Sequence, residues 1–366
     1  MDRAVSAWLA QQSISANQHA TFIKKLQKSY VVYGCMVLLP TNTFTQREAE
    51  TCLTPAELEH LYKFIALHLK ITHIAISRPI PLHDLGNDAE ENLMRSPSNF
   101  TPLFGEFGQS TCSKPPTQAD FDDALWVTTK QNGIYQTWSP RWTMFSRGNI
   151  SEKTRLLGLD SIVGAVQHGE EDGKGCSAVD LYVGIGYFAF SYAKAGVRKV
   201  LGWDLNAWSC EGMQRGAKAN KWKAVLMCAD GSEMLGAAEN AETRFLMFNE
   251  SNEQAAARIE RMRSRLPPIR HVNCGLLPTS RGSWQTAVEV LDAKMGGWVH
   301  VHENFAIDEI ERRSVEVRAA FQTLVASQED SERRVELQHV NRLKSYAPGV
   351  IHCVLDIYIS PSTHAI

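Results

Sequence analysis

The sequence predicts an α/β protein whose larger part is a mostly parallel sheet covered by helices, preceded by a smaller α+β region. Two observations support this prediction. From about Trp138 onward, apolar strand-like runs alternate with segments of helical periodicity, which is typical of parallel strands joined by right-handed crossovers. The chain then finishes with two strand-like runs, "RVELQHVNRLKSY" and "GVIHCVLDIYI", with no helix between them. This pair indicates an antiparallel hairpin at one edge of the sheet.

Apolar runs and turn residues indicate the elements of the larger region. The predicted strands are "AVDLYVG", "KVLGWD", "KAVLMCA", "RFLMFNE", "IRHVNCGLL" and "GWVHVHEN". The predicted helices are "YFAFSYAKAG", "NAWSCEGMQRGAKAN", "NEQAAARIERMRSR", "SWQTAVEVLDAKMG" and a long helix from Asp308 to about Gln328. The segment "GLDSIVGAVQHGEEDGKGCSA", with its acids and glycines, is interpreted as a surface loop. This order of elements is that of the Rossmann-like class I methyltransferase sheet.

Residues 1–138 predict a separate α+β domain, and residues 139–366 the larger one. A helix is expected from Ala16 to Lys28, followed by the strand "YVVYGCMVLLP". Thr54 and Pro55 form a helix-start pair before "AELEHLYKFIALHLK", and the strand "THIAISRPI" comes next. "ALWVTTKQNGIYQTW" predicts a hairpin, because two β-rich runs flank an Asn-Gly turn.

The composition describes an ordinary globular protein. The chain has 366 residues, enough for two domains, with 44% hydrophobic and 21% charged residues. No apolar run reaches the length of a membrane span and the first residues lack a signal-peptide core, so we expect a cytoplasmic protein. The eight cysteines are scattered without zinc-binding spacing, which favours reduced thiols and no metal.

The net charge of −2 argues against a protein that coats nucleic acid, but basic residues cluster locally. The clustered residues are Arg258, Arg261, Arg263, Arg265, Arg270, Arg312, Arg313, Arg318, Arg342 and Lys344. Each of them taken alone is explained by a solvated helix face. Together they leave open a patch that binds a phosphate backbone.

The glycine-rich segment "DLYVGIGYF" predicts a nucleoside site. Gly184 and Gly186 let the backbone approach a ligand at the carboxyl end of a strand. The third glycine of a dinucleotide motif is replaced by Ala189, and no Lys-Ser/Thr pair of a phosphate loop follows. Asp204 ends the next strand, where a carboxylate can accept both hydroxyls of a ribose. This combination fits S-adenosylmethionine, with Asp180 ordering the turn; the alternative is a plain tight turn with a capping aspartate.

The adenine end of this ligand has two candidate partners. Asp230 follows the strand-like run "KAVLMCA", and Glu250 follows "RFLMFNE". Only one strand is needed before "HVNCGLL", and the sheet order favours the strand that is followed at once by a helix. We therefore favour Glu250 and interpret the other segment as an insertion, with Asp230 kept as the alternative.

Five long segments resemble the fungal tRNA wybutosine-synthesising protein 2 family. They are "QNGIYQTWSPRWTMFSRGNISEKTRL", "DLYVGIGYF", "HVNCGLLPTSRGSW", "GGWVHVHEN" and "KSYAPGVIHCVLDIYI", and the resemblance runs from about Leu93 to the C-terminus. The related tRNA guanine-N1 methyltransferases have a short Asn-Leu-Pro motif on the fourth strand. Here the motif is the longer "NCGLLPTS", as in the aminocarboxypropyl-transferring branch, although Cys274 replaces a residue that is usually apolar.

The resemblance implies a reaction, a co-substrate and a partner. The 3-amino-3-carboxypropyl group of S-adenosylmethionine is transferred to carbon 7 of 4-demethylwyosine beside the anticodon of tRNA(Phe), and methylthioadenosine is released. No metal is implied. The family likeness leads us to expect a cytoplasmic monomer whose N-terminal domain contacts the tRNA.

The resemblance also assigns roles within "SRGNISEK". Ser146 and Lys153 match family residues that contact S-adenosylmethionine, and a hydroxyl with an ammonium suits its methionine carboxylate. Glu152 and Arg147 are candidate catalytic residues: Glu152 holds the ammonium group of the ligand or takes the ring proton. The alternative is a helix start in which Asn149 caps the helix and Glu152 completes a capping box.

The fourth strand and the residues after it supply the base-reading candidates. Asn273 is placed like an amide that other members direct at the target base, and is the third catalytic candidate. Pro278, Ser280 and Trp284 are expected to line the mouth of the site together with Thr279, and Trp284 either stacks on the tricyclic base or belongs to the core.

His300 and His302 lie two residues apart and therefore on one face of a strand. Metal ligation and a proton relay are alternative roles for this pair, but the sequence offers no third metal ligand at a suitable spacing. We favour the interpretation that both histidines are buried and hydrogen-bonded. The proton that the acceptor base loses needs no side chain as its base, because water can take it.

Three other functions are weighed against this one. A methyltransferase acting on the same purine would release S-adenosylhomocysteine instead of methylthioadenosine. A non-catalytic tRNA-binding scaffold is disfavoured by the intact set of Gly184, Gly186 and Asp204. A small-molecule methyltransferase would need neither the N-terminal domain nor the clustered arginines.

Overall fold

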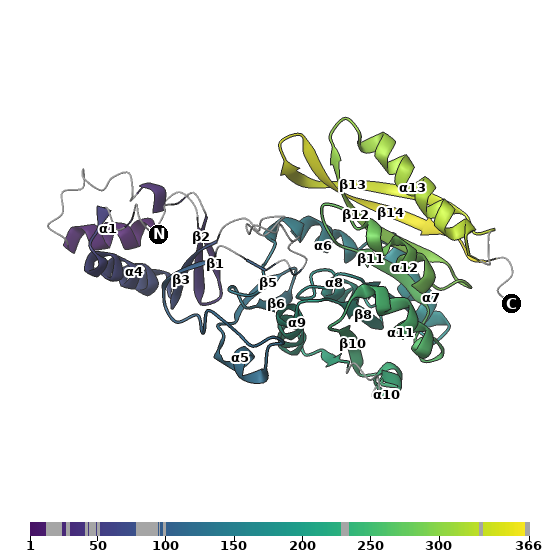
Figure 1. The fold of residues 1–366 in the computed structure, drawn as a ribbon, viewed down its shortest axis with the longest axis horizontal. Helices are drawn as coiled ribbons and strands as arrows, with labels where there is room; N and C mark the ends of the chain where they lie inside the picture. Colours follow the sequence, from purple (N-terminus) through teal and green to yellow (C-terminus); the bar gives the residue numbers. More distant parts are fainter. Residues whose placement is uncertain are drawn as a thin grey trace. The chain divides into compact units, whose positions relative to one another are not determined.

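The computed structural model describes residues 1–11, 24–26, 30–40, 43, 49, 52–77, 94, 96–97, 100–227, 234–328 and 332–362. The chain divides into two compact units, each with its own sheet and core (Figure 1). The smaller unit comprises Met1–Thr129 and Thr137–Phe145, and the larger comprises Lys130–Gln136 and Ser146–Ile366.

In the described part of the smaller unit, the helices α1 (Asp2–Gln11) and α4 (Pro55–Leu69) pack with a four-stranded sheet around one core. Its sheet has the order β1 (Val31–Tyr33), β2 (Met36–Pro40), β3 (His73–Ser77), β4 (Thr101–Phe104). The short helix α5 (Gln118–Asp123) also belongs to this unit. The Thr54 side chain accepts from the backbone N–H of Glu57, whose own carboxylate accepts from the N–H of Thr54, so the predicted helix start is confirmed. Most of the helix expected from Ala16 to Lys28 lies outside the described residues.

The predicted hairpin is formed by β5 (Val127–Gln131) and β6 (Ile134–Trp138). Both residues of its turn have positive φ, 53° at Asn132 and 73° at Gly133, as a two-residue turn between twisted strands requires.

The larger unit is built on an eight-stranded sheet in the order β13-β14-β12-β11-β7-β8-β10-β9. These strands are β7 (Ser177–Asp180), β8 (Lys199–Trp203), β9 (Lys223–Leu226), β10 (Thr243–Phe248), β11 (Ile269–Cys274), β12 (Gly297–Ala306), β13 (Val335–Ala347) and β14 (Val350–Ile359). The strands from β12 to β9 run parallel, and β14 is antiparallel to both β12 and β13. The expected Rossmann-like sheet with an antiparallel C-terminal hairpin is therefore confirmed.

Helices cover both faces of this sheet. They are α6 (Ile150–Leu156), α7 (Asp160–Glu171), α8 (Ala189–Lys194), α9 (Ala207–Ala219), α10 (Met234–Glu239), α11 (Ala255–Met262), α12 (Trp284–Val290) and α13 (Ile310–Ala326). Successive strand residues point to opposite faces, and so Val200 joins the core with Phe190 of α8 while Leu201 joins the core with Phe321 of α13. The long helix expected from Asp308 is α13.

The expected surface loop after α6 is wrong, because this segment contains the helix α7. Ile162, Ala165 and Gly169 are buried at helical spacing along it. Gly169 lies against Gly175, whose backbone N–H donates to the Gly169 carbonyl at 2.7 Å. The glycines that indicated a loop allow this close approach instead.

The two candidate third strands occupy different places. β10 pairs with β8, and β9 pairs only with β10 at the edge of the sheet. The strand before Glu250 is therefore the inner one, and the run "KAVLMCA" is the added edge strand, as the sequence favoured. Asp230 lies outside the described residues.

Among the helices that the structure describes, none is both long and apolar enough to span a bilayer.

The turn after β7 requires glycine at two positions. Gly184 and Gly186 have φ values of +54° and +86°, which lie in the region that L-residues with a side chain rarely adopt. A Cβ on Gly186 would also lie 2.8 Å from the buried ring of Phe190. The turn therefore excludes side chains both by its backbone conformation and by its packing.

We expect Gly186→Ala to lower the free energy of unfolding by about 1–3 kcal/mol, because it introduces backbone strain and a clash with Phe190. Urea denaturation followed by circular dichroism measures this change. Gly164→Ala is the control, since a Cβ there meets nothing within 4 Å inside α7 and should leave stability equal or raise it by up to about 1 kcal/mol. Equal effects of the two substitutions would contradict the assignment.

Candidate active site at the carboxyl edge of the sheet

The carboxyl ends of three neighbouring strands gather most of the predicted ligand-binding residues. Asp180 at the end of β7 is in register with Asn273 on β11 and with Gly202 on β8. The glycine turn follows Asp180, and Asp204 follows β8. Because parallel strands present their carboxyl ends at one edge, residues 93 positions apart become neighbours, as Asp180 and Asn273 do.

Asp204 holds the glycine turn directly. One of its oxygens accepts from the backbone N–H of Gly184 at 2.9 Å, and the other accepts from the N–H of Asn206 at 2.8 Å. Burial raises the pKa of this carboxyl to about 6. These contacts are the ones expected if Asp204 only caps a tight turn. Each of its oxygens still has a second lone pair, which can accept from a ribose hydroxyl.

Asp180 and Asn273 form a buried pair with unused hydrogen-bonding capacity. The Asn273 side-chain NH2 donates to Asp180 Oδ1 at 3.1 Å, and burial raises the pKa of Asp180 to about 7. Asp180 Oδ2 and Asn273 Oδ1 have no hydrogen-bond partner within the described part of the chain. Such buried polar atoms are rare and call for a ligand or water beside them. Together with the glycine turn they fit a nucleoside co-substrate.

Lys153 stands beside the glycine turn. Its ammonium donates to the side-chain oxygens of Gln131 at 2.6 Å and Gln136 at 2.9 Å, and the Gln136 amide in turn donates to the carbonyl of Gly186 at 3.4 Å. Burial, followed by the charge of Lys344, lowers the pKa of Lys153 to about 8. An anionic carboxylate placed here would relieve this penalty.

Ser146 contacts the same turn, because it is hydrogen-bonded to Tyr187. The Ser146 backbone N–H donates to the Tyr187 hydroxyl at 3.3 Å, and the Lys153 ammonium lies 5.7 Å from the centre of the Tyr187 ring. The Ser146 hydroxyl accepts from Lys344 at 3.4 Å. The two residues expected to hold the methionine carboxylate thus approach one aromatic side chain of the turn.

The capping-box alternative at the start of α6 is not formed. Asn149 makes no capping hydrogen bond and instead accepts from Lys344 at 3.0 Å. The Glu152 side chain is 1% exposed, and both of its oxygens accept from Arg155, one of them also from Asn341. Asn149 and Glu152 therefore bond to Lys344 and Asn341 of β13, and Glu152 also to Arg155 of its own helix, instead of capping the helix start. Arg147, in a 3-10 turn before α6, is exposed.

The loop after β11 is held by a glutamate of β12. Glu303 accepts from the hydroxyl of Thr279 at 2.8 Å and from the N–H of Ser280 at 2.9 Å. The Pro278 carbonyl accepts from the backbone N–H of Asn304 at 3.0 Å. Burial raises the pKa of Glu303.

Trp284 begins α12 and is 6% exposed. Its ring packs against Phe321, and its N–H donates to the hydroxyl of Ser280 at 3.1 Å. Of the two expected roles of Trp284, these contacts are those of a core residue and not of a side chain that stacks on the base.

Sequence comparison identifies the family. The chain is 36% identical over 337 residues to tRNA wybutosine-synthesizing protein 2 of Schizosaccharomyces pombe, a match that covers 90% of this chain and 72% of that protein. It is 33% identical over 318 residues to tRNA wybutosine-synthesizing protein 2 of Saccharomyces cerevisiae, covering 80% of this chain and 61% of that protein. The chain belongs to the tRNA wybutosine-synthesizing protein 2 family. A comparison with models of protein families finds no match.

Solved structures of low identity share the fold. Pyrococcus horikoshii TYW2 in complex with MeSAdo matches with a TM-score of 0.60 at 17% identity, over 99% of both chains. Trm5b from Pyrococcus abyssi matches with a TM-score of 0.57 at 12% identity, over 96% of this chain and 80% of that one. The Rossmann-like fold of the family is thus shared with a group of related proteins.

The acid favoured for the adenine end is engaged in an ion pair. Glu250 accepts from Arg258 at 2.8 Å and 3.0 Å, and from the ring N–H of Trp203 at 3.4 Å. Its position after the inner strand agrees with the prediction, and its role toward adenine stays a prediction. Any role for Asp230 falls outside the described residues.

The two histidines of β12 are buried and hydrogen-bonded, as the sequence favoured. His300 contacts Asp356 at 2.7 Å and His271 at 3.1 Å, and His302 contacts His352 at 3.0 Å. Within the residues that the structure describes, no three His, Cys, Asp or Glu side chains are grouped for a metal ion.

The clustered arginines are largely engaged with nearby acids. The pairs are Arg258–Glu250, Arg263–Glu260, Arg265–Glu239, Arg312–Glu309, Arg312–Glu316 and Arg313–Glu316. This is the solvated, ion-paired helix face, and it does not support a free basic patch at these positions.

Sequence reasoning missed several residues that shape the site: Tyr187, Gln136, Arg155 and Asp356. Asp356 had a detectable signal, because an acid within the apolar run "VIHCVLDIYI" of a strand must find a buried partner. Its partner Arg155 lies 201 positions away, and nothing local indicates that pairing.

We expect Lys153→Ala to weaken the binding of S-adenosylmethionine far more than that of methylthioadenosine. The reason is that Lys153 is placed to hold the methionine carboxylate, which methylthioadenosine lacks. Isothermal titration calorimetry with each ligand measures the two losses. Losses of equal size would contradict the role of Lys153 in anchoring the tail.

The raised pKa of Asp204, about 6, predicts a pH-dependent affinity. Ribose hydroxyls donate to the ionised carboxylate, and protonation below pH 6 removes this acceptor. Methylthioadenosine, which has no group that ionises in this range, should bind about tenfold more tightly at pH 8 than at pH 5. Calorimetry at both pH values measures the difference.

Asp204→Asn is the matched variant, because it keeps the shape and removes the charge. Its affinity should be low at both pH values, and any slope that remains belongs to Asp180. A variant that keeps the wild-type slope would refute the ribose role of Asp204.

Proposed function

We propose that this chain transfers the 3-amino-3-carboxypropyl group of S-adenosylmethionine to carbon 7 of 4-demethylwyosine in tRNA(Phe), releasing methylthioadenosine. The observation that carries the proposal is the 36% identity to a tRNA wybutosine-synthesizing protein 2 over 90% of this chain. As a member of this family, the chain is an S-adenosylmethionine-dependent transferase that modifies tRNA in wybutosine synthesis. The specificity for tRNA(Phe), the action as a monomer and the cytoplasmic location belong to the proposal.

The chemistry requires a choice among three carbon–sulfur bonds. The co-substrate supplies a positive sulfur that activates all three neighbouring carbons, so that whichever carbon lies in line with the incoming nucleophile is transferred. The new C–C bond forms at the methylene carbon of the tail, the electron pair of the broken C–S bond passes to sulfur, and the acceptor carbon loses its proton to water. The selection is therefore geometric.

The residues around the glycine turn support that geometry. The Lys153 ammonium and the Ser146 hydroxyl hold the carboxylate of the tail, which orients the methylene carbon and turns the methyl group away. Asp204 accepts from the ribose hydroxyls. Asp180 orders the turn, because its Oδ1 accepts from the backbone N–H of Tyr182 at 3.3 Å. Asn273 directs its free Oδ1 at the acceptor base or the ligand.

The residues beyond this centre serve the tRNA in the proposal. Residues 1–138 form the domain that contacts the tRNA. Pro278 and Thr279, which are exposed, line the mouth of the site, while Ser280 is buried beneath them and Glu303 holds this loop. Arg147 is exposed before α6, where it is available to a phosphate or the base.

Methyl transfer to a guanine is the second candidate, because the fold is shared with a tRNA m1G37 methyltransferase of M. jannaschii, with a TM-score of 0.53. The two reactions differ in the group that leaves sulfur and in the nucleoside that remains. Methylthioadenosine marks the first reaction and S-adenosylhomocysteine the second.

We expect label to enter the RNA when the protein is incubated with 4-demethylwyosine-containing tRNA(Phe) and S-adenosylmethionine labelled in its carboxypropyl portion. Chromatography of the small products should show methylthioadenosine. A parallel reaction with methyl-labelled S-adenosylmethionine is the control and should leave the RNA unlabelled. Label entering only from the methyl group would establish the second candidate instead.

A further inference from the structure

Helix α6, which carries Lys153, depends on contacts with distant parts of the chain. It has seven residues, and no side chain caps its N-terminus. A helix this short has little stability of its own in water. The position of Lys153 is therefore decided by whatever fastens α6 to the rest of the larger unit.

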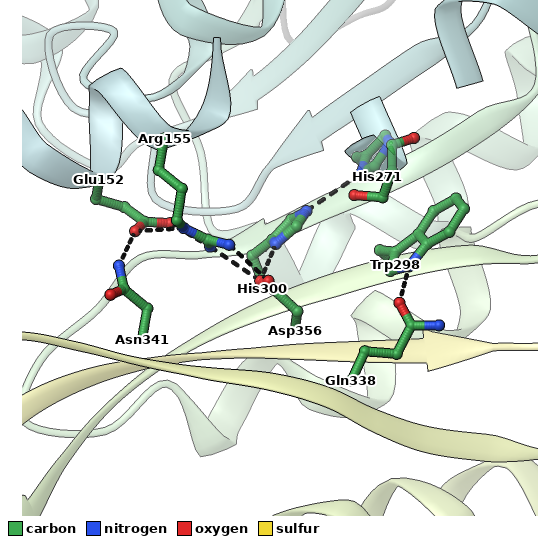
Figure 2. A network of polar contacts seen from close by, with 9 residues as sticks. Glu152, Arg155, His271, Trp298, His300, Gln338, Asn341 and Asp356 are labelled. Carbon is green, nitrogen blue, oxygen red and sulfur yellow. Dashed lines mark hydrogen bonds and ion pairs between the residues drawn. The ribbon is translucent and has the colours of Figure 1, made fainter. Parts of the chain in front are cut away.

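Arg155 fastens α6 to strand β14. Its guanidinium donates to Asp356 at 2.6 Å and 3.0 Å, and to Glu152 on its own helix at 2.6 Å and 2.9 Å (Figure 2). The exposed fractions of the side chains are 19% for Arg155, 1% for Glu152 and 6% for Asp356. A bidentate pair of this kind fixes direction as well as distance.

Asp356, which accepts from Arg155, is also held by a buried histidine of β12. Asp356 also accepts from His300 at 2.7 Å, and His300 contacts His271 at 3.1 Å on the neighbouring strand (Figure 2). Burial alone would raise the pKa of Asp356, but its hydrogen bonds and the charges of His300 and Arg155 outweigh this and lower the pKa. The Asp356 carboxylate is therefore ionised, and His300 and Arg155 both hold it by hydrogen bonds.

Strand β13 provides further ties to the same segment. Asn341 donates to Glu152 at 2.6 Å, and Lys344 donates to Asn149 at 3.0 Å. The segment from Ser146 to Arg155 is therefore attached to the C-terminal hairpin at both of its ends.

We propose that the Arg155–Asp356 ion pair is a positioning element that sets where Lys153 stands over the glycine turn, and thereby which arm of S-adenosylmethionine faces the acceptor. Arg155 acts through α6, because its Nε, Nη1 and Nη2 atoms donate to Asp356 and Glu152. Glu152 is a buried anchor in this arrangement and not a base. The inference rests on the proposed function, because it concerns the residue that holds the tail.

The test compares two ligands that differ only in the tail and the charge that comes with it. Arg155→Lys keeps the positive charge and loses the bidentate geometry, and Asp356→Asn keeps the shape and loses the charge. We expect both variants to bind S-adenosylmethionine about tenfold to a hundredfold more weakly, as a small misplacement of a positioning group does. Methylthioadenosine should bind within about twofold of wild type, because the glycine turn and Asp204 are untouched.

Two further variants complete the set. Asn341→Ala removes one hydrogen bond to Glu152 from the partly exposed edge strand, and should show a smaller loss of the same kind even where Asp356→Asn fails to fold. Arg215→Lys is the matched control, since Arg215 pairs with Glu211 at 2.7 Å on α9. It should leave both affinities unchanged.

Product analysis gives a second readout that a merely structural role would not move. With S-adenosylmethionine and the tRNA, the Arg155→Lys variant should raise the ratio of S-adenosylhomocysteine to methylthioadenosine, because a loosened tail no longer excludes the methyl group. Parallel losses for both ligands, or wild-type affinity for both, would overturn the proposal. Absence of carboxypropyl transfer in the wild type would refute the proposed function alone, and the binding comparison would still decide the role of Arg155.

Discussion

A largely buried ion pair between Arg155 and Asp356 joins segments 201 positions apart within the larger unit. One partner lies on a short helix beside the glycine turn, and the other lies on the last strand of the sheet. Two opposite charges out of water must be well matched, since an unpaired one would be strongly destabilising. The requirement is met by Glu152 and His300, which supply the remaining hydrogen bonds.

This ion pair connects the antiparallel hairpin of β13 and β14 to α6, which stands beside the glycine turn. The nucleoside end of the site is local: Asp180, the glycine turn and Asp204 belong to two adjacent strands and the turns that follow them. The tail end is assembled from α6, which is placed by β13 and β14. A reaction that must distinguish one substituent of sulfur from another needs the two ends to be rigid relative to each other.

Much of the fold could be predicted because its signals are short-range. Apolar runs separated by helical periodicity predicted the sheet, and the final pair of runs predicted the hairpin. The prediction failed at α7, where acids and glycines indicated a loop. Gly169 is there for a close backbone contact with Gly175, and no pattern within the segment reveals a neighbour of that kind. The capping-box alternative at α6 is not formed for a related reason: Glu152 accepts from Asn341, 189 positions away, which the segment itself does not reveal.

The sequence by itself determined the glycine turn and the acid that holds it, which the proposal assigns to the nucleoside. Gly184, Gly186 and Asp204 follow strands closely, so their spacing along the chain brings them together at the sheet edge, and the positive φ values of the turn favour glycine. The tertiary structure alone decided that Glu152 accepts from Asn341, that Lys153 donates to Gln131 and Gln136, and that Trp284 packs against Phe321. Each of these side chains is buried by elements far away in the chain, and burial obliges a polar group to pair with whatever the fold brings near.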